Sequence, residues 1–140
     1  MIDIKKYTVE KINKNAKNTM VEFLDIEITE IGADFICGKM PVSNKTIQPA
    51  GILHGGASVV LAETLGSIAG NCCIDTEKFY CVGLEINANH IRPVPLGNMV
   101  FARANAIHLG KKTQIWEIKI TNAEDKLVCI SRLTLSVVSK

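Results

Sequence analysis

The segment from Gly55 to Cys73 constrains the fold more than any other part of the chain, because it holds a single charged side chain, Glu63. A helix that is apolar on most of its surface must be covered by other structure. Glycines lower helix propensity, and those in this segment are tolerable where a sheet or a second helix approaches the backbone closely. The apolar residues recur at helical spacing and predict one long helix; they are Ala57, Leu61, Leu65 and Ile68.

The residues before this segment predict a short helix and a hairpin. Apolar side chains within 2–16 are spaced as on a short amphipathic helix. Residues 20–42 alternate between apolar and charged side chains, and the segment 30–34 supplies a turn, which predicts a hairpin. The residues that carry the alternation are Val21, Phe23, Ile26 and Ile28.

The residues after the helix predict strands to the end of the chain. Short turns join these strands, which is typical of an antiparallel sheet. We therefore expect an α+β fold in one domain, 1–140, with one hairpin, one central helix and then a meander, the curved antiparallel sheet wrapping around the helix. The strand-like segments are 80–94, 99–110, 113–125 and 126–139.

Composition excludes several classes of protein. Hydrophobic residues make up 47% and charged residues 21%, which is ordinary for a globular protein. A net charge of +2 is too balanced for a general nucleic-acid binder. The N-terminus lacks the apolar core of a signal peptide, and Glu63 interrupts the best candidate membrane span. Five cysteines without a Cys-x-x-Cys pair or zinc-ligand spacing indicate free thiols in a reducing cytoplasm.

Glu63 is the first candidate functional residue. It could be a surface residue on the one wet stripe of the helix, but no other charge shares such a stripe. A carboxylate buried without a cationic partner has a raised pKa, and perturbed groups concentrate at functional sites. On a helix it shares a face with residues three, four and seven positions away, namely Val59, Val60, Gly66, Ser67 and Gly70.

The sequence His54-Gly55-Gly56 marks the start of the helix and is the second candidate. Two glycines allow the backbone to approach a ligand closely. The N–H groups of the first turn have no partner within the helix, so they can stabilise a developing oxyanion. An equally good interpretation is that His54 lies near the N-cap and that the glycines only form a tight turn.

The distance between the two candidates predicts a dimer. Gly56 and Glu63 lie seven residues apart, which is about 10 Å along a helix. One helix therefore does not readily bring both groups to one carbonyl, whereas two antiparallel copies related by a two-fold axis do. We expect Gly66, Ser67 and Gly70 to allow close packing there.

Three stretches together resemble the hotdog-fold acyl-CoA thioesterases, from about Val21 to the end of the chain. They are GILHGGASVVLAETLGSIAG, VGLEINANHIRPV and HLGKKTQIWEIKI. The likeness is strongest to the branch that contains 1,4-dihydroxy-2-naphthoyl-CoA hydrolase and the proofreading thioesterase of enterobactin synthesis, with phenylacetyl- and 4-hydroxybenzoyl-CoA thioesterases more distant. The resemblance implies a hotdog fold, hydrolysis of a thioester, and no metal or cofactor.

The resemblance also implies roles for individual residues. Glu63 matches the catalytic carboxylate, as nucleophile or as general base. Gly55 matches the backbone N–H that polarises the thioester carbonyl, and Gln48 and His54 match groups beside the thioester. Ser67 matches a hydroxyl that supports the carboxylate or the attacking water. The remaining matches are substrate-binding positions, namely Val82, Gly83, His90 and Arg92.

In the relatives, one subunit supplies the groups that match Gln48 and Gly55, and its partner supplies the glutamate. The expected assembly is therefore a dimer with shared sites, or a tetramer made of two dimers. The expected substrate is an acyl-CoA, with an aromatic group such as 1,4-dihydroxy-2-naphthoyl or hydroxybenzoyl, or an acyl- or aryl-carrier-protein thioester. A medium acyl chain and broad specificity remain open.

Two other functions deserve comparison with hydrolysis. A non-catalytic acyl-CoA-binding or sensing module would need no carboxylate at the thioester, yet this chain keeps Glu63 with Gln48 and His54. A hotdog dehydratase uses a histidine on a different segment. Among the other residues, Lys111 and Lys112 could meet coenzyme A phosphates or form a solvated turn, and we expect the remaining three to have structural roles, namely Cys72, Cys73 and Trp116.

Overall fold

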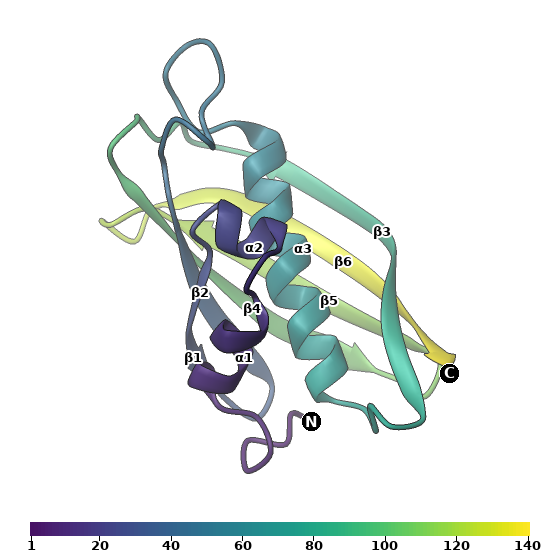
Figure 1. The fold of residues 1–140 in the computed structure, drawn as a ribbon. Coiled ribbons are helices and arrows are strands. Elements are labelled where there is room, and N and C mark those ends of the chain that lie inside the picture. Colours follow the sequence, from purple (N-terminus) through teal and green to yellow (C-terminus); the bar gives the residue numbers. More distant parts are fainter.

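The computed structural model describes all residues from 1 to 140, and it shows one long helix lying across a curved antiparallel sheet (Figure 1). The sheet order is β1-β2-β4-β5-β6-β3, and every neighbouring pair is antiparallel. This confirms the predicted α+β fold. The helices are α1 (Val9–Asn15), α2 (Met20–Phe23) and α3 (Gly55–Cys72); the strands are β1 (Glu27–Ile31), β2 (Phe35–Pro41), β3 (Phe79–His90), β4 (Met99–Leu109), β5 (Thr113–Thr121) and β6 (Leu127–Ser139).

The helix α3 packs closely on the sheet because glycines face it. A methyl group built on Gly66 would lie 2.4 Å from Leu133 Cδ2, and one on Gly70 would lie 2.4 Å from Leu135 Cδ1. The prediction that a sheet would approach the glycines is confirmed. The prediction that Gly66 and Gly70 would pack at a subunit interface is wrong, because β6 of the same chain already fills the space against them.

The strand predicted around Val21 and Phe23 is a short helix instead. Thr19 caps α2, and its hydroxyl accepts a hydrogen bond from the Val21 N–H at 3.2 Å. Positive φ angles at Asn18 and Asp25 bound the helix on both sides. The apolar alternation is therefore split, and the first strand begins only at Glu27.

The predicted meander holds for β4, β5 and β6 but fails for β3. Strand β3 pairs with β6 at one edge of the sheet, and β4 pairs with β2. The connecting segment 91–98 contains Pro93 and Pro95, which have no N–H to donate to a ladder. This segment leaves the sheet and crosses it, so that β3 is left with one unpaired edge.

Helix α1 covers the opposite edge of the sheet. The Asn13 side chain donates to the Ile28 carbonyl and accepts from the Ile28 N–H, both at 2.9 Å. The Asn13 side chain thus makes the two hydrogen bonds to β1 that the backbone of a neighbouring strand would make. Trp116 is fully buried, as expected for a core residue. No helix is both long and apolar enough to cross a lipid bilayer.

Candidate active site

The N-terminus of α3 presents one N–H group without an acceptor. His54 is the N-cap, and its Nδ1 accepts from the Gly56 N–H at 2.8 Å. The Ala57 N–H donates to the His54 carbonyl at 3.0 Å, while the Gly55 N–H makes no hydrogen bond within the chain. A free N–H at the positive end of a helix is a group that can stabilise negative charge on an oxygen.

A pocket of about 350 Å³ lies beside this N–H, and we call it the α3 N-terminal pocket. Its wall includes four of the residues predicted from the sequence: Gln48, Gly55, His90 and Arg92. A methyl group on Gly55 would lie 2.8 Å from His90 Nε2, so the absence of a side chain there admits the imidazole. The pocket therefore joins a backbone donor, an amide, an imidazole and a guanidinium.

Two side chains of this pocket are held by the backbone. Gln48 Oε1 accepts from the Ala50 N–H at 2.6 Å, which leaves its amide N–H groups available. The Arg92 guanidinium donates to the Leu127 carbonyl, at the start of β6. His54 does not line this pocket. Its ring borders a separate hollow beside Phe23 and Lys45, so its observed role in the chain is the helix cap.

Glu63 lies two turns further along α3 and outside that pocket. Its Oε1 accepts from the Ser67 hydroxyl at 3.4 Å, and no salt bridge reaches it. Burial raises the pKa of the Glu63 carboxyl above its ordinary value, and the bond from Ser67 offsets part of that rise. The carboxylate is thus half-buried without a cation, in the kind of environment that raises the basicity of a catalytic acid or base.

Strand β3 closes over this carboxylate at Gly83. A methyl group built on Gly83 would lie 2.5 Å from Glu63 Oε1. The pairing of β3 with β6 shifts register between Gly83 and Glu85, so a bulge lies at this contact. Val82 is exposed on the same strand and does not line the α3 N-terminal pocket. The structure therefore places Gly83 against the carboxylate.

Substituting Gly83 with alanine should move the Glu63 carboxylate while preserving the fold. Gly83 has no positive φ, so alanine fits its backbone, and the atom that the new methyl group meets is the far end of a side chain. A displacement of about 1 Å at a reacting group lowers turnover by roughly 10- to 100-fold. Thiol release measured beside thermal unfolding checks this. Unchanged turnover would show that the Gly83 contact has no part in the reaction.

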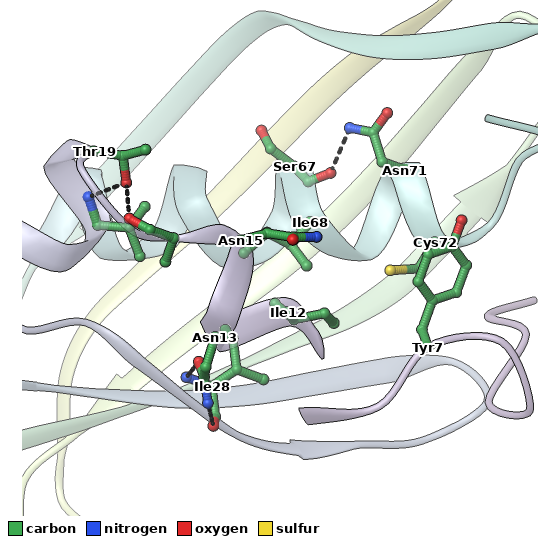
Figure 2. A pocket seen from close by; sticks show the side chains of 12 residues that line it. Tyr7, Ile12, Asn13, Asn15, Thr19, Ile28, Ser67, Ile68, Asn71 and Cys72 are labelled. Atoms are coloured by element: carbon green, nitrogen blue, oxygen red, sulfur yellow. Dashed lines mark hydrogen bonds between the residues drawn. The ribbon is translucent and has the colours of Figure 1, made fainter. Parts of the chain in front are cut away.

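A second pocket, of about 380 Å³, lies between α1 and α3, and we call it the α1–α3 pocket (Figure 2). Ser67 lines it and also donates to Glu63, so this side chain stands between the pocket and the carboxylate. Sequence reasoning missed this pocket. The apolar face predicted for residues 2–16 was the one sequence feature that could have indicated it, because Tyr7 and Ile12 on that face form part of the pocket wall.

The cysteines offer no competing nucleophile. Burial raises the pKa of Cys72 to about 12 and that of Cys81 to about 11. Both thiols are therefore protonated near neutral pH, whereas the thiolate is the reactive form. No group of three or more His, Cys, Asp or Glu side chains is arranged to hold a metal ion. The remaining candidates for chemistry are the Glu63 carboxylate and the donors at the α3 N-terminus.

Comparison with known proteins gives a consistent result. The sequence profile of the thioesterase superfamily matches residues 50–129. The 1,4-dihydroxy-2-naphthoyl-CoA hydrolase of Escherichia coli is 47% identical over 98% of this chain and 99% of its own length. The proofreading thioesterase EntH of Cronobacter turicensis is 44% identical over 98% of both chains.

Solved structures agree with these sequence matches. A thioesterase of Haemophilus influenzae superposes with a TM-score of 0.93 at 51% identity, covering 99% of this chain and 96% of that one. A thioesterase of Pseudomonas aeruginosa, solved as a glutamine-to-alanine variant, gives a TM-score of 0.96 at 43% identity over the whole of both chains.

Proposed function

The chain belongs to the thioesterase superfamily and is a thioester hydrolase with the hotdog fold, and from this premise we propose that its substrate is an acyl-CoA with an aromatic acyl group. The products are the free acid and coenzyme A. A relative that is 47% identical to this chain is named 1,4-dihydroxy-2-naphthoyl-CoA hydrolase, which supports an aromatic acyl group of this kind. A hydroxybenzoyl group is the smaller alternative.

The observation that carries the mechanism is the separation of two half-sites. The Gly55 N–H lies free in the α3 N-terminal pocket, while Glu63 lies outside it beside Gly83. The complete site in this proposal pairs the α3 N-terminal pocket of one subunit with Glu63 of its partner. Gln48 and His90 then lie beside the thioester, and Arg92 borders its channel.

The free edge of β3 supports this assembly. Edge strands with unpaired backbone groups and apolar side chains are sites of strand pairing. Tyr80, Val82 and Leu84 are 41%, 39% and 63% exposed on this edge strand. Pairing with β3 of a second copy covers them and brings the two copies of α3 alongside each other. Two such dimers form the tetramer that the resemblance implies.

The chemistry proposed for the site has two routes. As a general base, Glu63 takes a proton from water while the water oxygen bonds to the thioester carbonyl carbon. The carbonyl oxygen becomes an oxyanion that accepts from the Gly55 N–H, and its collapse breaks the C–S bond and releases the thiolate of coenzyme A. As a nucleophile, Glu63 bonds to that carbon first and forms a mixed anhydride that water then hydrolyses.

The α1–α3 pocket supplies room for the acyl group in this proposal. Its volume lies within the usual range for small-molecule sites, about 300–1,000 Å³. Its apolar side chains include Ile12, Val21 and Ile68, which favour an aromatic or aliphatic group over a charged one. The pocket reaches the carboxylate through Ser67.

Thiol release from a panel of CoA thioesters tests the function. The panel contains 1,4-dihydroxy-2-naphthoyl, 4-hydroxybenzoyl, phenylacetyl, medium-chain and long-chain acyl groups. We expect the aromatic esters to give the highest kcat/KM. Faster hydrolysis of the aliphatic esters would contradict the aromatic assignment, and hydrolysis of an aryl-carrier-protein thioester alone would replace acyl-CoA as the substrate class.

A further inference from the structure

We propose that Asn71 is a positioning residue for the Glu63 carboxylate, through a side-chain link between α3 and the edge strand β3; this inference rests on the proposed role of Glu63. The Asn71 Nδ2 donates to the Ser67 carbonyl at 2.9 Å, as Figure 2 shows. Its Oδ1 accepts from the Cys81 N–H at 3.0 Å. One amide therefore joins the helical turn that carries Ser67 to the strand that carries Gly83.

The two ends of this link lie next to the two contacts of the carboxylate. On the helix side, Asn71 holds the carbonyl of Ser67, whose hydroxyl donates to Glu63 Oε1. On the strand side, it holds the N–H of Cys81, two residues before Gly83, which lies against the same Oε1. A shift of β3 away from α3 would break the contact between Gly83 and the Glu63 carboxylate. It would also expose the carboxylate to solvent and remove the burial that raises its pKa.

Strand β3 needs such a link at this point. It pairs with β6 along one edge only, and the bulge after Gly83 interrupts that pairing beside Glu63. The Cys81 N–H points away from β6, since Val137, opposite Cys81, donates its own N–H to Lys112. Asn71 makes the only side-chain hydrogen bond between α3 and β3.

Asn71 differs from Asn13, whose side-chain amide lies at the other edge of the sheet. Asn13 satisfies both backbone groups of Ile28 on β1. Asn71 instead spans two elements, and it lies one helical turn from Ser67 and two from Glu63. Its location therefore suits the alignment of the carboxylate as well as the closure of an edge.

Substituting Asn71 with leucine tests the inference, because leucine has a similar size and makes neither hydrogen bond. We expect kcat to fall on the order of 10-fold, the effect of a sub-ångström displacement of a reacting group, with KM within about twofold. The fall should be equal for every acyl-CoA that the wild type hydrolyses. Hydrogen exchange of the peptide that contains residues 79–84 should become faster. Asn71→Ala serves if the leucine variant does not fold.

Asn122→Leu is the matched control. The Asn122 Oδ1 accepts from the N–H groups of Glu124 and Lys126 at 3.1 and 2.9 Å, in the turn between β5 and β6. This variant also loses two backbone hydrogen bonds, and it should keep wild-type turnover. An equal fall in kcat in both variants would overturn the inference, because it would indicate a general loosening of the fold.

Two further outcomes would overturn the inference. Wild-type kcat in Asn71→Leu would remove Asn71 from the positioning of the carboxylate. A fall confined to some acyl groups, with a raised KM, would make Asn71 a wall of the α1–α3 pocket only. Glu63→Gln is assayed in parallel, because wild-type turnover in that variant would remove Glu63 from the mechanism on which this inference rests, whereas a wild-type chain that hydrolyses no acyl-CoA would overturn the proposed function.

Discussion

Glu63→Gln is expected to lose turnover by roughly 100- to 10,000-fold, the contribution typical of a positioned general acid or base. Glutamine keeps the size of the side chain and an oxygen that accepts from Ser67, but it neither takes a proton from water nor attacks a carbonyl. Thiol release from the best substrate of the panel measures the loss. Near wild-type turnover would remove Glu63 from the mechanism.

The stability of the same variant separates lost chemistry from lost structure. The pKa of Glu63 is raised in the folded chain by burial, so the folded state binds the proton more tightly than the unfolded state. The stabilising effect of the protonated form is fully present below the unfolded pKa of about 4.3 and is lost as pH rises through the folded pKa. Glutamine stays neutral, so Glu63→Gln should unfold at a higher temperature than the wild type at pH 7–8, and the difference should shrink toward pH 4.

Gly55→Pro is expected to lose turnover by about 100- to 1,000-fold relative to Gly55→Ala, the effect of one oxyanion donor. Proline removes the free N–H that faces the α3 N-terminal pocket. It is well tolerated at the first position of a helix, and the ψ of 132° at His54 is suitable for a residue before proline.

Gly55→Ala is the control for this pair, because both variants place a Cβ against His90 while alanine keeps the N–H. The ratio of their kcat values therefore reports the loss of the N–H together with the ring carbons that take its place. Equal rates for the two variants would show that the oxyanion finds its donors elsewhere.

The sequence predicted α3 well because its pattern is long and continuous. The largely apolar segment from Gly55, with Glu63 as its only charge, identifies a covered helix, and the structure has α3 over Gly55–Cys72. Helix α2 was missed because its few residues, with Val21 and Phe23 two apart, match a strand as well as a helix. Only the cap at Thr19 distinguishes them.

Other features depend on contacts between distant segments. The place of β3 beside β6 follows from pairing across the sheet, which local alternation does not encode. The same is true of the contact between Gly83 and Glu63 and of the link from Asn71 to Cys81. The catalytic candidates could be identified along the chain, whereas the groups that hold them in place required the fold.

The most direct test of the central proposal, a site shared between two subunits, is the activity of a mixed dimer. Glu63→Gln and Gly55→Pro chains with different affinity tags are co-expressed, and each is also assayed alone. A dimer with one chain of each kind has one site with native Glu63 and native Gly55, and one site with both changes. Random association makes half of the dimers mixed, so activity should recover to about a quarter of the wild-type value per chain. Mixtures no more active than either variant alone would contradict the shared site and would place both groups at work within one chain.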